Sequence, residues 1–148
     1  MLLAFFEGII TALGALVLEL AVLAVFNLPP AENTLFTLLI FVAIEESLKY
    51  AIIYNHSLKA NSREKIFANA VFIGLGFALT ELFLKQLDYQ KISFLPIFGL
   101  LFIHLFTAGT VGFFLKQKYD QHKLFIFLLL VLNVILHFGY NFLILRYF

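Results

Sequence analysis

The sequence predicts an all-α protein, a polytopic transmembrane helical bundle with about five spanning helices. The first observation is composition, because 63% of the 148 residues are hydrophobic, only 13% are charged, and the mean hydropathy is +1.01. Soluble domains are about 45–50% apolar and about 25% charged, which gives them enough polar side chains to cover their surface. The second observation is length: five apolar segments reach the roughly 20 residues that a helix needs to cross a hydrocarbon core about 30 Å thick.

The first predicted helix covers residues 2–26 and ends before the pair Pro29-Pro30. Proline has no backbone N–H and cannot continue a helix without breaking its hydrogen bonding. No lysine or arginine precedes the apolar run, and the run is longer than the roughly 7–15 residues of a signal-peptide core. We therefore expect a retained membrane helix and not a cleaved signal.

The remaining predicted helices cover 35–54, 66–87, 95–115 and 124–145. Asn33-Thr34 and Asn61-Ser62 offer side chains that cap helix N-termini. Tyrosines stand at or near the proposed boundaries, where interfacial aromatic residues are favoured: Tyr54, Tyr89, Tyr119 and Tyr147. No internal repeat or linker is present, so we expect residues 1–148 to form a single transmembrane domain.

The basic residues predict the orientation of the chain in the cell membrane. Five spans place the two termini on opposite sides. Cytoplasmic loops carry an excess of lysine and arginine, which predicts a cytoplasmic N-terminus and an extracytoplasmic C-terminus. The basic residues of the proposed cytoplasmic side are Lys59, Arg63, Lys65, Lys116, Lys118 and Lys123, and those of the other side are Lys85, Lys91 and Arg146.

Several chemistries are excluded by residues that the sequence lacks or places outside the spans. The absence of cysteine removes disulfides, thiolate nucleophiles and cysteine metal ligands. A net charge of +1 without a basic tract gives no indication of nucleic acid binding. Asp88 and Asp120 lie in predicted loops, which excludes a two-aspartate protease, and the zinc motif HExxH is missing. Ser47, the only serine within a predicted span, lacks the flanking glycine turn of a serine protease. Carboxylate and imidazole chemistry remain.

Ionisable side chains inside the predicted spans indicate a functional site, because each costs about 2.5–3.5 kcal/mol to insert. With a rise of about 1.5 Å per residue, the carboxylates and imidazoles lie ~10–15 Å below the outer boundary, in one layer of the outer half. Lys49 lies about one turn deeper, at i+3 and i+4 from a glutamate pair. Glu7 is close enough to the cytoplasmic end to be interfacial. The polar residues within the spans that indicate this site are Glu19, Glu45, Glu46, Lys49, Glu81, His104, Asn133, His137 and Asn141.

Four segments, in order on successive predicted helices, resemble the PrsW family of intramembrane proteases. The segment EESLK at 45–49 resembles the family motif EExxK, GLGFALTE at 74–81 resembles GxGFAxxE, and HFGYN at 137–141 resembles HxxxN. The segment HLFT at 104–107, with Gly112, also matches. PrsW belongs to the wider group of CAAX-processing and bacteriocin-processing (CPBP) proteins. The first predicted helix carries no motif, and Leu82 stands where the family commonly has asparagine.

The resemblance implies a glutamate-dependent endopeptidase that cuts a membrane-anchored protein, such as an anti-sigma factor, near the outer face. In this hypothesis one of Glu45 or Glu46 is the general base on a water molecule. His137 and Asn141 donate hydrogen bonds to the oxyanion. His104 orients the water or passes a proton to the leaving amine. Glu81 orients a histidine or shares a proton with the glutamate pair.

Three alternatives stay open at this point. We expect no cofactor, but two histidines with carboxylates are also legitimate zinc ligands, so a metal-dependent protease remains possible chemistry. Buried carboxylates and histidines also form proton relays, as in a small proton-coupled transporter. Five spans without an inverted repeat fit common transporter plans poorly. The third alternative is a non-catalytic immunity or scaffold protein on the same fold. Glu19, which no motif covers, is expected to have a structural or gating role.

Overall fold

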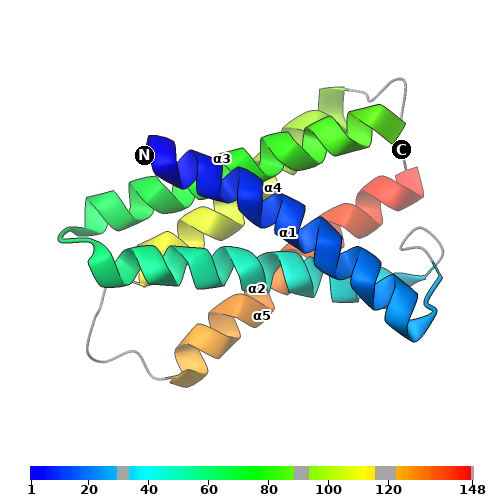
Figure 1. Cartoon of the computed structure of the whole chain (residues 1–148), viewed down its shortest axis with the longest axis horizontal. Coiled ribbons are helices and arrows are strands. Elements are labelled where there is room, and N and C mark those ends of the chain that lie inside the picture. The colour runs from blue at the N-terminus through cyan, green and yellow to red at the C-terminus, as the bar shows by residue number, and fades with distance from the viewer. Residues whose placement is uncertain (30–33, 89–93, 116–122, 148) are drawn as a thin grey trace.

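The computed structural model describes residues 1–29, 34–88, 94–115 and 123–147. Within these ranges the chain forms helices and no strands, which confirms the predicted all-α bundle (Figure 1). The helices are α1 (Leu2–Phe26), α2 (Leu35–Lys59), α3 (Arg63–Asp88), α4 (Phe94–Phe114) and α5 (Lys123–Tyr147). The bounds of α1 agree with the prediction, whereas α2 continues past residue 54 and α3 begins before residue 66. Charged and polar residues extend these two helices beyond their apolar parts.

The predicted helix caps at Thr34 and Ser62 are confirmed. The Thr34 hydroxyl accepts a hydrogen bond from the backbone N–H of Thr37 at 3.1 Å, and Ser62 Oγ accepts one from the N–H of Lys65 at 3.3 Å. At the other end of α1, Asn27 adopts the left-handed conformation that asparagine tolerates, with φ 50°. Several predictions fall outside the described residues, namely those for Pro30, Asn33, Tyr89, Lys91, Lys116, Lys118, Tyr119 and Asp120.

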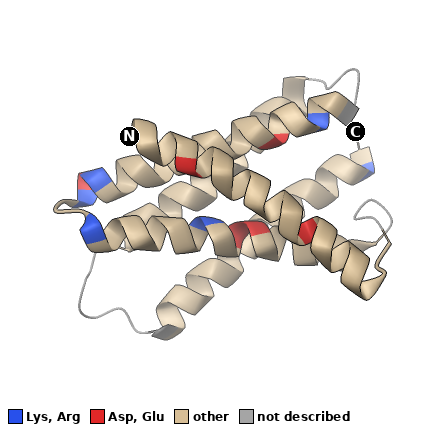
Figure 2. Cartoon of the chain, viewed as in Figure 1, with Lys and Arg blue, Asp and Glu red and all other residues tan. Residues whose placement is uncertain are grey.

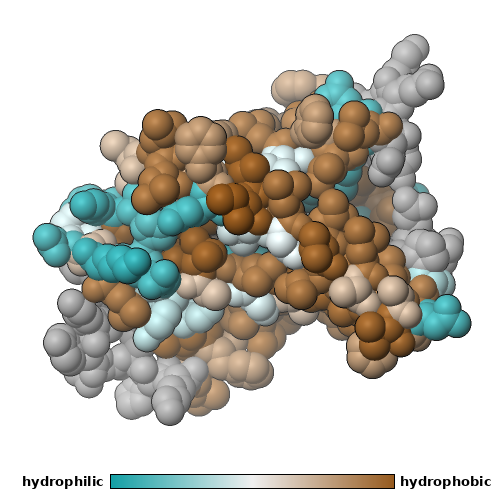
Figure 3. All heavy atoms as spheres, in the orientation of Figure 1, coloured by the Kyte–Doolittle hydropathy of each residue, from teal (hydrophilic) through white to brown (hydrophobic). Residues whose placement is uncertain are grey.

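Helices α1, α3, α4 and α5 are each long and apolar enough to cross a membrane, so the chain is a membrane protein. Apolar side chains cover most of the face seen in Figure 3. Helix α2 is as long as α1, at 25 residues, but Glu45, Glu46 and Lys49 lie near its middle. All three side chains are buried inside the bundle. Helix α2 is thus not one of the four apolar helices, and the neighbouring helices enclose its charges.

Helix α2 contacts every other helix, although the most extensive packing is that of α3 with α1 and α4. It packs against each of the other four helices, while α1 packs against α3, α3 against α4, and α4 against α5. Among the described residues, no comparable packing joins α5 to α1 or to α3. The other helices thus surround α2 as an incomplete ring, and the buried face of α2 points toward them.

Glycines set the close approach of α3 to its two neighbours. A Cβ atom on Gly8 would lie 2.2 Å from the carbonyl oxygen of Ile73, and one on Gly76 would lie 2.2 Å from that of Phe5. Small residues allow such backbone contact between membrane helices. Beyond this crossing, α1 and α3 diverge toward their C-terminal ends (Figure 1). On the side of α4, Gly74 packs against the backbone of His104, which fixes the register of these two helices.

The basic residues that the structure describes are unequally divided between the two ends of the bundle. The C-terminal end of α2 and the N-terminal end of α3 lie together (Figure 1) and carry Lys59, Arg63 and Lys65. In Figure 2 this end holds a basic cluster, whereas the opposite end has two separate basic positions on α3 and α5. These are Lys85 and Arg146. Acidic residues lie mainly between the two ends.

Candidate active site

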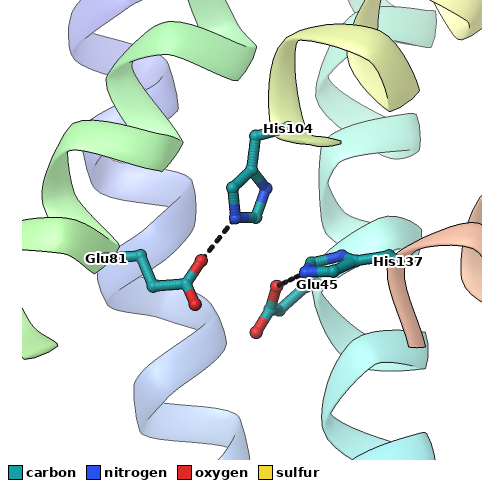
Figure 4. A group of neighbouring side chains, drawn as sticks. All are labelled: Glu45, Glu81, His104 and His137. Carbon is teal, nitrogen blue, oxygen red and sulfur yellow. Dashed lines mark hydrogen bonds and ion pairs between the residues drawn. The ribbon is translucent and has the colours of Figure 1, made fainter. Parts of the chain in front are cut away.

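Four of the predicted site residues converge inside the bundle from four different helices. They are Glu45 of α2, Glu81 of α3, His104 of α4 and His137 of α5 (Figure 4). Each offers one oxygen or nitrogen atom, and these atoms all lie within 4.8 Å of one another. Both imidazole rings are fully buried, and they meet edge to face with centroids 4.7 Å apart. The layer predicted from helix depths is therefore one physical cluster.

Glu46 connects this cluster to further residues by hydrogen bonds. Its Oε1 atom accepts hydrogen bonds from Lys49 Nζ at 2.6 Å, from His137 Nδ1 at 2.7 Å and from the Thr107 hydroxyl at 3.3 Å. Of the two carboxylates that the spacing made available to Lys49, the lysine thus pairs with Glu46. An oxygen shared by three donors is held firmly, so Glu46 is a positioning group.

Lys49 fixes the tautomer of His104. The lysine nitrogen lies 2.9 Å from His104 Nδ1, and an ammonium group can only donate. His104 Nδ1 therefore accepts, and the ring proton is on Nε2, which donates to Glu81 Oε2. Both nitrogens of His104 are thus engaged. The sequence indicated Lys49 only as an ion-pair partner and gave no role to Thr107, because their contacts depend on how α2 and α4 face each other.

His137 presents its other nitrogen to Glu45. Because His137 Nδ1 donates to Glu46, the Nε2 atom of the neutral ring is an acceptor. This Nε2 lies 3.7 Å from Glu45 Oε2, and neither atom has a hydrogen-bond partner among the described residues. Two buried acceptors that face each other need a shared hydrogen donor to offset their desolvation. A water molecule that donates one hydrogen to each atom meets this need.

Glu45 differs from the other two carboxylates of the cluster in lacking a lysine. Lys49 pairs with Glu46, and Lys85 pairs with Glu81 at 2.7 Å. Within the described part of the chain, the ionic contact of Glu45 is the long one with His137. Glu45 is therefore the carboxylate most available to take up a proton.

The predicted polar stripe of α5 divides into two parts. The Asn133 amide donates to the carbonyl of Thr107 at 3.2 Å and accepts from the Thr110 hydroxyl at 3.0 Å, which ties α5 to α4. Asn141, one turn beyond His137, is buried and makes no hydrogen bond to another described residue. Its amide is free to bind a ligand, whereas that of Asn133 is not.

No family model matches the chain, and no curated protein or solved structure matches it. Function is therefore inferred from the geometry of the site together with the sequence motifs.

The donor set fits zinc only in part. His137 resembles a metal-ligating histidine, because its Nδ1–H is held by a carboxylate and its Nε2 is free. Glu45 offers a free oxygen as well. His104 Nε2 carries a proton, and Glu81 already binds His104 and Lys85 through its two oxygens. Catalytic zinc uses three protein ligands, so Glu81 or His104 would have to release a present partner before zinc could bind.

Proposed function

We propose that the protein is an intramembrane endopeptidase of PrsW type, which hydrolyses a peptide bond of a membrane-anchored protein with a glutamate-activated water. The observation that carries this proposal is the pair Glu45 Oε2 and His137 Nε2, two buried acceptors 3.7 Å apart without a partner among the described residues. In lipid, unsatisfied polar groups are costly and mark functional positions. The order of the PrsW-like motifs along the chain supports the same reaction.

In the proposed reaction each of these residues has one role. Water held between Glu45 and His137 attacks the peptide carbonyl carbon while Glu45 takes one of its protons. The Asn141 amide donates a hydrogen bond to the developing oxyanion. As the C–N bond breaks, the proton passes from Glu45 to the leaving nitrogen, and the other water hydrogen stays with the new carboxyl group. No proton is gained or lost in the cycle.

The remaining residues of the site act by positioning. Glu46 orients His137, and Lys49 together with Glu81 orients His104, whose ring supports that of His137. Because Glu46 orients His137, the general base of the proposed reaction is Glu45 and not Glu46. The role of His137 also differs from the sequence-based hypothesis, because its free nitrogen accepts from the water and leaves Asn141 as the oxyanion donor.

The positive-inside pattern supports a cytoplasmic N-terminus and an extracytoplasmic C-terminus, which puts the site in the outer half of the membrane. The substrate is then a membrane-anchored protein cut near its outer face, such as an anti-sigma factor by family resemblance. The partners are this substrate and the lipid bilayer, without nucleic acid.

The decisive test is cleavage of single-span candidate substrates in liposomes. We expect Glu45→Gln to lower the rate by about 10²–10⁴-fold, because it removes the general base. The matched control is Ser47→Ala, on the exposed side of the same helix, which should cut at the wild-type rate. A chelator should leave the rate unchanged, whereas a zinc-dependent enzyme would stop.

Two results would reject the proposal. Wild-type turnover by a folded Glu45→Gln protein would exclude glutamate catalysis. Proton flux through the same liposomes without any cleavage would instead indicate the small transporter. A non-catalytic immunity or scaffold protein would show neither activity and would keep its cellular effect after the substitution.

A further inference from the structure

Two charged residues outside the proposed reaction lie beside the site. Lys85 is one turn beyond Glu81 on α3 and pairs with it at 2.7 Å. Glu19 of α1 is partly buried and lies near enough to this pair for Lys85 to attract its carboxylate and for Glu81 to repel it. No PrsW-like motif covers Glu19, and the reaction uses neither residue directly. A charge at this depth needs a reason, because it is costly in hydrocarbon.

Exposure rises along one path from the centre of the site to Lys85. The side chain of His104 is 0% exposed, that of Glu81 is 14% exposed and that of Lys85 is 40% exposed. Because His104 bonds Glu81 and Glu81 bonds Lys85, this series leads outward along α3. The accessible side of the buried cluster is therefore the side of Lys85.

Glu19 and Lys85 belong to the two helix halves that diverge. Helices α1 and α3 touch at Gly8 and Gly76 and still pack through Ala12, Ala15 and Phe77, and their C-terminal ends diverge beyond these contacts (Figure 1). Glu19 is about 17 Å beyond Gly8 along α1, and Lys85 is about 14 Å beyond Gly76 along α3, at a rise of about 1.5 Å per residue. The two charges thus stand at matching levels on the two sides of the divergence.

We propose that the substrate segment enters laterally between the outer halves of α1 and α3, and that Glu19 and Lys85 are the specificity-determining residues of this entrance. The inference rests on the proposed function. A peptide bond can reach Glu45 only if the substrate helix is locally unwound, and unwound backbone in lipid has unsatisfied N–H and C=O groups. Glu19 can accept from such N–H groups.

Lys85 can serve the carbonyl groups of the same segment. An ammonium group has three donors, so Lys85 can keep its bond to Glu81 and donate to a substrate carbonyl at the same time. The entrance then favours an extended, easily unwound segment of a single-span protein over a stable, continuous helix. Specificity comes from backbone conformation and not from one recognised side chain.

The entrance can be closed by cross-linking, because the chain has no cysteine of its own. The variant Glu19→Cys with Lys85→Cys is treated with a bifunctional thiol reagent that a reductant can cleave. The matched control is Phe114→Cys with Phe125→Cys, which joins α4 to α5 where the two exposed rings lie 5.5 Å apart. This control links two neighbouring helices without bridging α1 and α3.

We expect the cross-link between positions 19 and 85 to reduce the cleavage rate at least tenfold and the reductant to restore that rate. The control variant should cleave the substrate at the same rate in its cross-linked and reduced forms. Equal cleavage by the cross-linked and reduced forms of the first variant would reject substrate entry between α1 and α3. If wild-type protein cuts no substrate at all, the proposed function fails, which is a different result.

A second readout does not depend on turnover by the cysteine variant. In the Glu45→Gln background, a photoreactive residue replaces Leu23, one turn beyond Glu19 on α1, or Phe106, on the exposed face of α4. We expect a single-span substrate to be captured from position 23 and not from position 106. Capture from position 106 alone would place the entrance elsewhere and reject the proposal, even if the cysteine pair is inactive after reduction.

Discussion

Two polar clusters lie at different depths of the bundle and differ in how completely their hydrogen bonds are satisfied. In the cluster on the proposed cytoplasmic side, called the inner cluster, His56 of α2 bonds Glu7 of α1 through Nε2 and accepts from the Asn69 amide of α3 through Nδ1. The candidate active site, called the outer cluster because of its proposed side, has three carboxylates for two lysines and leaves Glu45 Oε2 and His137 Nε2 without described partners. A satisfied cluster ties helices together, whereas an unsatisfied one is built to bind a further group.

An apolar layer separates the two clusters. Ile53 lies one turn from Lys49 toward His56, and it packs in one buried hydrophobic cluster with Ile73 and Ala70. These side chains are almost entirely inaccessible. A proton-coupled transporter needs a continuous relay of polar groups. The interruption at Ile53 therefore favours a reaction confined to the outer cluster over transport through both.

The largest combined effect on stability and cleavage is expected from Lys49→Met in the outer cluster. Removing the ammonium group leaves Glu46 buried without its cation, which costs about 3–5 kcal/mol when one partner of a buried pair is lost. It also releases the tautomer of His104. We expect a lower unfolding temperature in detergent together with loss of cleavage. Unchanged stability and cleavage would mean that the network around Glu46 does not organise the site.

A smaller effect, on catalysis alone, is expected from Asn141→Ala. Loss of one oxyanion donor typically lowers kcat by about 10²–10³-fold. Because the Asn141 amide has no described partner, the unfolding temperature should change little. The matched control is Asn133→Ala, which breaks the tie between α5 and α4 and should lower stability more than kcat. If both variants lose the same activity and stability, Asn141 is a structural residue like Asn133.

The sequence allowed the helices and most of the outer cluster to be predicted. Apolar length identifies the spans, and the motifs single out Glu45, Glu81 and His104 with their neighbours. The choice of Glu46 as the partner of Lys49 could not be predicted, since i+3 and i+4 spacings are both compatible with pairing. Contacts between helices depend on their rotation and register, which close packing at Gly8 and Gly76 determines.

The contacts of the inner cluster could not be predicted from the sequence either. Glu7 was expected to be interfacial, and no motif contains His56 or Asn69. The side chain of Glu7 on α1 contacts His56 on α2. It can do so because the glycine crossing of α1 and α3 holds the N-terminal half of α1 close to the bundle. Three unremarkable residues, far apart in sequence, become one hydrogen-bonded group only through that packing.

The smallest effect on catalysis is therefore expected in the inner cluster. His56→Gln should lower stability by about 1 kcal/mol, the usual net worth of a hydrogen bond, and should leave the cleavage rate unchanged, since the apolar layer isolates it from Glu45. Unfolding temperature and cleavage measured on one preparation test both parts. Glu7→Gln is the companion variant, because it changes the same contact from the side of α1. Loss of cleavage in both variants, at wild-type stability, would show that the inner cluster also affects the reaction. The inner cluster would then not be a purely structural contact between helices.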